Sequence, residues 1–102
     1  MMQAVGLIEV YGLVAAFVAA DAACKKANVV IESFDNNKPL NAEALPVPLI
    51  IVVKLRGDLE NVKIAVDAAV DAANKISGVV STDIIAKPEN DTEKLLKLNC
   101  LK

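Results

Sequence analysis

The chain has 102 residues, and we expect residues 1–102 to form a single domain. Its formal charge is −2 without a concentrated basic cluster, which argues against nucleic-acid binding. Because the sequence contains no histidine, imidazole bases and histidine metal ligands are excluded. Hydrophobic residues make up 55% of the chain, above the roughly 45–50% typical of soluble domains. This excess favours a protein whose apolar surface is covered by other subunits.

The first half of the chain predicts a strand, a helix and a second strand. Residues 3–10 and 29–34 are predicted as strands, and the alanine-rich residues 13–27 as a helix. The predicted buried face of this helix repeats at three-four spacing and consists of Leu13, Ala16, Phe17, Ala20, Ala23 and Cys24. On this interpretation Cys24 is a small buried hydrophobe.

A long connection with several prolines follows the second predicted strand. Residues 36–48 hold three of the four prolines in the chain, whereas a plain hairpin needs only about two to five connecting residues. Loops of this length in compact domains are commonly functional or disordered. Because each proline restricts the backbone, we expect the connection to hold a defined shape.

The second half repeats the strand–helix–strand order. Residues 49–55 are nearly all apolar, which predicts a strand buried on both faces. Asp58 is predicted to cap a helix that runs to about residue 76, and residues 79–86 are predicted as the fourth strand. Residues 90–93 match a capping box, with Glu93 bonding back to a polar N-cap, before a short helix at 92–98. The order predicts an α+β, ferredoxin-like βαββαβ fold with an antiparallel sheet and a short C-terminal helix.

Nothing in the sequence predicts an enzyme, a cofactor site or a metal site. Glu9 and Glu32 fall in predicted strands, but no nucleophile or base is placed to work with either of them. Cys24 and Cys100 lie far apart without metal-binding spacing, which favours free thiols in the cytosol over a disulfide. The longest uncharged apolar stretch is well short of the ~20 residues that span a bilayer. We therefore predict a soluble, cytoplasmic protein without a membrane partner.

Four segments together carry a family resemblance: AVGLIEVYGL at residues 4–13, AADAACKKANV at 19–29, RGD at 56–58 and IAKP at 85–88. They resemble the single-domain, hexamer-forming shell proteins of bacterial microcompartments (BMC-H). They occur in order along nearly the whole chain. The resemblance implies a structural subunit that forms a flat cyclic homo-hexamer with a central pore. It also implies edge-to-edge tiling with other shell proteins, enclosed enzymes, and passage of small polar metabolites through the pore.

The resemblance also implies two sets of functional residues. The connection between the second and third strands lines the pore, and here it includes Asn36, Asn37, Lys38, Pro39, Leu40, Asn41, Ala42 and Glu43. The hexamer edge includes Lys25, Asn28, Lys87 and Pro88. The pore connection is longer than the family's short Gly/Ser turn by about eight to ten residues, which predicts a narrowed opening. Lys87 stands where the family usually has arginine, so the planar guanidinium fork is absent from that position.

Simpler interpretations of these residues stay open at this point. Lys25 could be an ordinary solvated lysine near a helix C-terminus, and Asn28 could simply end that helix. A different function class is also compatible with the fold. In that alternative, a ferredoxin-like regulatory module binds a small effector at a subunit interface, with the long connection as its lid. A small ferredoxin-like enzyme fits less well, because the chain lacks recognisable catalytic groups.

Overall fold

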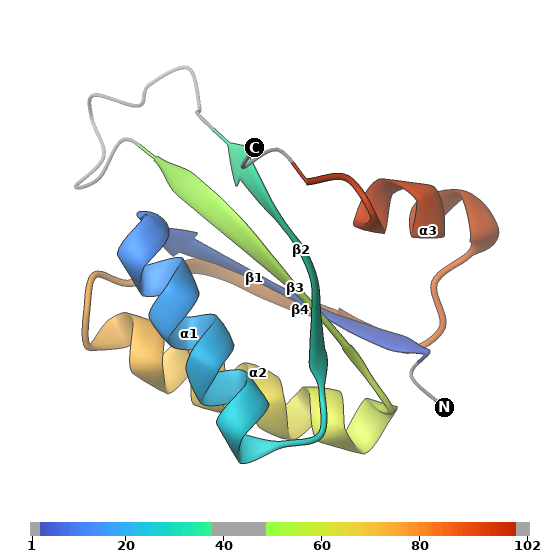
Figure 1. The fold of residues 1–102 in the computed structure, drawn as a ribbon, viewed down its shortest axis with the longest axis horizontal. Helices are drawn as coiled ribbons and strands as arrows, with labels where there is room; N and C mark the ends of the chain where they lie inside the picture. The colour runs from blue at the N-terminus through green and yellow to red at the C-terminus, as the bar shows by residue number, and fades with distance from the viewer. Residues whose placement is uncertain (1–2, 38–48, 100–102) are drawn as a thin grey trace.

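The computed structural model describes residues 3–37 and 49–99. The elements in these ranges are β1 (Ala4–Tyr11), α1 (Leu13–Lys26), β2 (Val30–Asn37), β3 (Ile50–Gly57), α2 (Leu59–Asn74), β4 (Val79–Ile85) and α3 (Asn90–Leu96). The strands form one antiparallel sheet in the order β2-β3-β1-β4. Helices α1 and α2 cover one face, and α3 lies apart from them on the other side (Figure 1). The predicted α+β, βαββαβ fold with a short C-terminal helix is confirmed.

The central strands β3 and β1 carry the core. Ile51, Val53 and Leu55 of β3 and Ile8 of β1 are fully buried in one cluster with the helices. The residues between them point to the opposite face, because successive side chains of a strand alternate. Those of β3 are also largely buried. The prediction that the third strand is covered on both faces is therefore confirmed.

The predicted buried face of α1 is confirmed for Ala16, Ala20 and Ala23 and wrong for its larger residues. Leu13 and Phe17 are 40% and 57% exposed, and Cys24 is also exposed. The prediction of Cys24 as a buried hydrophobe was therefore wrong. The buried residues of α1 are all alanines: Ala15, Ala16, Ala19, Ala20 and Ala23. Small side chains let α1 approach the alanines of α2 closely, which leaves the larger apolar residues outside the seam.

Helices α2 and α3 each begin with an N-cap residue whose side chain accepts a backbone hydrogen bond. The Asp58 carboxylate accepts a hydrogen bond from the backbone N–H of Asn61 at 2.9 Å, which confirms the predicted N-cap of α2. The capping box predicted for residues 90–93 was wrong. Glu89 caps α3 by accepting from the N–H of Asp91 at 3.0 Å. The side chain of Glu93 instead binds a guanidinium group, and such paired charge-assisted bonds are stronger than one bond to a backbone N–H.

Within the described ranges, every helix falls short of the length and apolar character that a membrane-spanning segment requires.

Gly6 lies where α2 crosses β1, and it sets how closely the helix approaches the sheet. A Cβ at this position would lie 2.7 Å from Cγ2 of Val66 and 3.0 Å from Cγ1 of Val62. We expect Gly6→Ala to lower the free energy of unfolding by about 1–3 kcal/mol through overpacking. Chemical denaturation would measure this loss. In a Val66→Ala background the loss should shrink, because the nearest clashing atom is gone, and an equal loss in both backgrounds would refute the explanation.

Candidate assembly surfaces

The structure places the described members of the two predicted sets of functional residues at opposite ends of the sheet. Asn37 and Tyr11 both pair with Ile50, so the connection from β2 to β3 leaves the sheet at this end. At the other end, Val30 pairs with Arg56, and Ala4 pairs with Gly57. The segments that precede β2 and follow β4 therefore lie at the other end of the sheet from Asn37 and Ile50. We refer to these as the connection end and the opposite end of the sheet.

Two of the predicted pore residues lie at the connection end. Asn36 and Asn37 are the last residues of β2, and both are exposed. The other predicted pore residues, 38–43, lie outside the described residues. The backbone N–H of Gly12 donates to the carbonyl oxygen of Leu49 at 2.8 Å, which ties the return to β3 to the start of α1. The described residues on both sides of the connection are therefore held by backbone pairing, Asn37 to Ile50 and Leu49 to Gly12.

The predicted edge residues occupy the opposite end, but they do not form one cluster. Lys25 is in the last turn of α1 and its ammonium lies 2.7 Å from the Asp21 carboxylate; the hydrogen bond to Asp21 raises the pKa of Lys25. Asn28 is exposed and precedes the outer strand β2. Lys87 is exposed and follows the other outer strand, β4, whereas Pro88 is buried. Three of the four side chains are therefore available to a neighbouring molecule.

Exposed apolar side chains mark both lateral margins of the subunit. Helix α1 lies on the β2 side, where the rings of Phe17 and Phe34 are 5.4 Å apart. On this margin Val14 is 66% exposed, beside the 37% exposed Val18. On the other margin, Val80 of β4 is 41% exposed. Tyr11 and Val79 lie at the connection end of the sheet, because Tyr11 pairs with Ile50 and Val79 pairs with Val10. Val14 and Val80 follow them closely in the chain and therefore lie near the same end.

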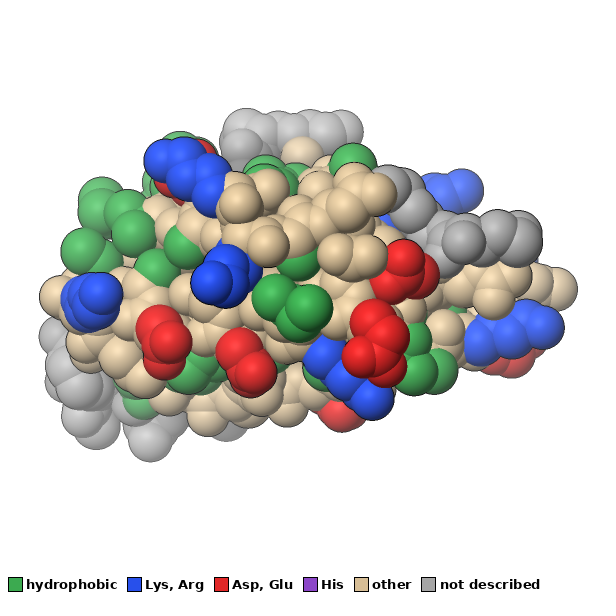
Figure 2. Space-filling model, turned by 90° about the horizontal axis from the view of Figure 1, so that it is seen from below, with side chains coloured by type: hydrophobic (Ala, Val, Ile, Leu, Met, Phe, Trp, Pro, Cys, Tyr) green, Lys and Arg blue, Asp and Glu red, His purple; other side chains and the backbone are tan. Residues whose placement is uncertain are grey.

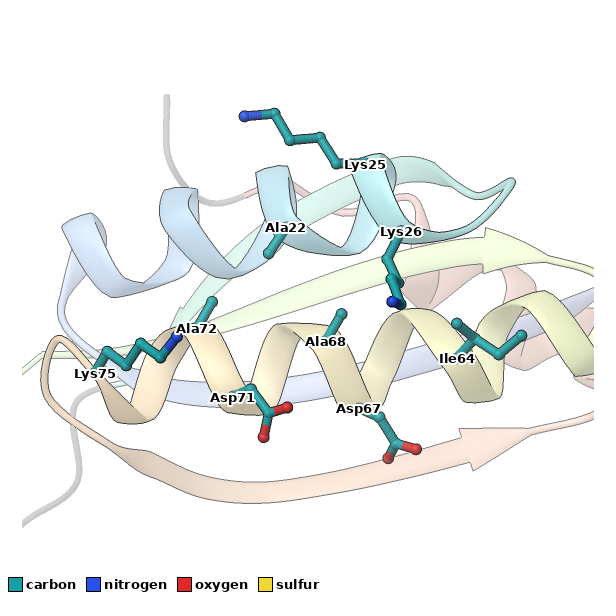
Figure 3. A pocket seen from close by; sticks show the side chains of 9 residues that line it. All are labelled: Ala22, Lys25, Lys26, Ile64, Asp67, Ala68, Asp71, Ala72 and Lys75. Carbon is teal, nitrogen blue, oxygen red and sulfur yellow. The ribbon is translucent and has the colours of Figure 1, made fainter.

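The groove between α1 and α2 has a volume of about 530 Å³. Figure 3 shows Ala22 facing α2, and Ala68 and Ala72 facing α1. These small side chains line the groove together with charged ones, namely Lys25, Lys26, Asp67, Asp71 and Lys75. Lys26 points towards α2, whereas Lys25 points away. Seen from below, this side of the molecule carries acidic and basic side chains interspersed with hydrophobic ones (Figure 2).

The second face of the sheet, opposite the one that α1 and α2 cover, carries buried cations that were not predicted from the sequence. The Arg56 guanidinium donates to both carboxylate oxygens of Glu93 at 2.6 and 2.8 Å, and to the carbonyl oxygen of Gln3 at 3.0 Å. The Lys54 ammonium donates to the carbonyl oxygen of Leu98 at 3.0 Å. A signal for these contacts was present in the sequence. Two cations spaced two residues apart in an otherwise apolar central strand share one face and require buried partners.

The ion pair of Arg56 and Glu93 is charged at neutral pH. The hydrogen bonds from Arg56 hold the pKa of Glu93 below its ordinary value of 4.5. Glu93 in turn raises the pKa of Arg56. A carboxylate with a lowered pKa stabilises the folded state at pH values above its ordinary pKa, and this contribution is lost as the pH falls through the lowered value. The pair is therefore insensitive to pH changes near neutrality.

Comparisons with known proteins agree with this architecture. The sequence matches the BMC domain family over residues 4–88. It is 37% identical over 94 residues to the bacterial microcompartment shell protein PduA of Citrobacter freundii, covering 92% of this chain and 91% of that protein. It is 35% identical over 100 residues to the carboxysome shell protein CcmK2 of Synechocystis sp., covering 96% and 88% of the two chains.

A solved structure supports the fold alone. A microcompartment protein from Desulfitobacterium hafniense DCB matches with a TM-score of 0.68 and 23% identity. The match covers 95% of this chain and 48% of that chain, so this chain spans about half of its length. The resemblance found in the sequence is confirmed by the family match and by the two similar proteins. The chain belongs to the BMC domain family of bacterial microcompartment shell proteins.

Proposed function

We propose that this shell protein forms a cyclic hexamer with the β2–β3 connection at its axis and Lys25, Asn28 and Lys87 at its rim. Members of the family are structural proteins of the microcompartment shell, which lies in the cytoplasm, rather than enzymes. The observation that carries the proposal is the separation of the two sets of residues along the strands. With the strands directed from axis to rim, one end of each subunit serves the pore and the other serves contact with neighbouring hexamers.

The two apolar margins fit the contacts within such a ring. A cyclic assembly of identical subunits joins one surface of each copy to a different surface of the next copy. The α1 margin with Val14 and the β4 margin with Val80 are two such surfaces on opposite sides of the subunit. Both lie near the connection end, so they would meet at a similar distance from the axis. Burying them would account for the high apolar content of this small chain.

The proposed pore would be lined by the β2–β3 connection, residues 36–43 in particular. Any side chain near the axis of a hexamer is repeated around it, and rings of polar or charged groups are how pores select solutes. Asn36 and Asn37 would contribute amide groups at the start of this lining. The connection is much longer than a hairpin turn, so six copies would restrict the opening. We propose small polar metabolites as the solutes that pass.

The proposed rim is tested by Lys25→Ala. Lys25 is exposed and contacts Asp21 of its own helix, so the substitution removes no core contact. We expect a folded hexamer that no longer tiles into extended sheets, observed by negative-stain electron microscopy. Lys63→Ala is the matched control, because Lys63 is also an exposed helix lysine and pairs with Glu60 three residues away. Sheets formed equally well by Lys25→Ala and the parent would exclude Lys25 from the rim contact.

A further inference from the structure

We propose that α3 is a detachable cover of the second face of the sheet. Arg56, Lys54 and Ser33 hold it there, and it is released as a unit while the sheet, α1 and α2 stay folded. This inference concerns a single subunit and does not depend on the proposed hexamer. It rests on the kind of contact that holds α3, on the small apolar area that α3 buries, and on the incomplete bonding of Arg56.

Polar groups of the sheet hold α3 along its whole length. Near its start, Glu93 accepts the two hydrogen bonds from Arg56. Near its end, the Ser33 hydroxyl donates to the carbonyl oxygen of Leu96 at 2.7 Å, and the Lys54 ammonium donates to that of Leu98. A cation at the carbonyl end of a helix is also favoured by the helix dipole. We call these the α3 docking contacts.

Apolar burial contributes little to the position of α3. Leu96 is its one buried residue, at 4% exposure, and it is not part of the core cluster that joins the sheet to α1 and α2. Leu95 is 62% exposed, and Leu98, just past the helix, is 52% exposed. A helix of seven residues is not stable alone in water. Helix α3 should therefore lose its structure when the docking contacts break.

Both sheet cations keep other acidic neighbours if the docking contacts break. Nε of Arg56 is buried and has no hydrogen-bond partner among the described residues, so the polar network is incompletely satisfied. Glu32 lies 3.5 Å from Arg56, and Asp35 lies 3.6 Å from Lys54, so both cations keep an acidic neighbour from β2 after α3 leaves. Release would free the guanidinium fork of Arg56 for a carboxylate other than that of Glu93.

Hydrogen exchange of the full chain tests the proposal through Glu93→Gln, which keeps the side-chain shape and removes its charge. At neutral pH we expect the amides of α3 to exchange about tenfold faster or more, with the amides of α1 and α2 unchanged. Raising the salt concentration from about 0.05 to 1 M should accelerate exchange in the parent α3, because the Glu93 side chain is 32% exposed and accessible to ions.

Lys94→Gln is the matched control. Lys94 is on the same helix and 80% exposed, and it pairs with Asp91 inside α3, so its loss should leave α3 exchange close to that of the parent. Lys54→Met removes the other docking cation and should accelerate exchange as Glu93→Gln does. Two results would overturn the proposal. One is unchanged α3 exchange in both docking variants, and the other is acceleration of α1 and α2 to the same extent as α3.

Discussion

Val14→Asp is expected to convert the proposed hexamer into folded monomers at micromolar concentration. Val14 is 66% exposed in the subunit and lies on the α1 margin that the proposed ring buries. A carboxylate buried in such an interface without a partner should weaken the association by about 2–5 kcal/mol per contact. The proposed ring repeats that contact at every junction between subunits. Light scattering coupled to size-exclusion chromatography would measure the mass, and circular dichroism would establish that the subunit is still folded.

Two further variants separate the interface from a general effect of charge. Val14→Thr keeps the shape of the side chain and adds no charge, so it should leave the ring assembled. Val80→Asp changes the opposite margin and should dissociate the ring as Val14→Asp does, because each junction joins the two margins. If Val14→Asp remained a hexamer, the α1 margin would not be part of the junction.

Replacing residues 38–47 with a short Gly-Ser turn is expected to preserve the hexamer and enlarge its axial opening. The described structure shows that a short turn is feasible, because Asn37 already pairs with Ile50 across β2 and β3. Leu49 is retained, since its carbonyl oxygen accepts the hydrogen bond from Gly12. The opening can be measured from an electron-microscopy map of the variant, or from passage of a small polar solute through assembled shells.

An equal-length control distinguishes the bulk of the connection from its prolines. A Gly/Ser segment that replaces residues 38–47 without shortening them should keep the opening restricted, because a similar volume of chain still converges on the axis. Loss of restriction in both variants would assign the effect to the stiffness of the prolines. An opening that is unchanged by the short turn would place the connection away from the axis.

The order and type of the main elements could be predicted from the sequence because local signals agreed with the fold. The nearly continuous apolar run of β3 indicated a central strand, and Asp58 marked the start of α2. The buried face of α1 could not be predicted in full, because almost all of its residues are apolar and periodicity then carries little information. Close packing of the α1 alanines against α2 determines which face of α1 is buried, and this contact exists only in the tertiary structure.

The assembly surfaces could be predicted only in part. Family resemblance supplied Lys25, Asn28 and Lys87, and the structure places them at the end of the sheet opposite Asn37 and Ile50. The contact of Arg56 with Glu93 joins residues 37 positions apart, so no local pattern encodes it. Glu93 instead matched a capping box, because that motif depends on spacing alone, whereas the real partner depends on how α3 meets the sheet.

The mass of the unmodified protein in solution tests the central claim most directly. We predict a particle with six times the subunit mass of 10.8 kDa, persisting on dilution to micromolar concentration because the proposed ring would bury the apolar margins between subunits. Multi-angle light scattering across a dilution series would measure it. A well-folded monomer or dimer under these conditions would contradict the account.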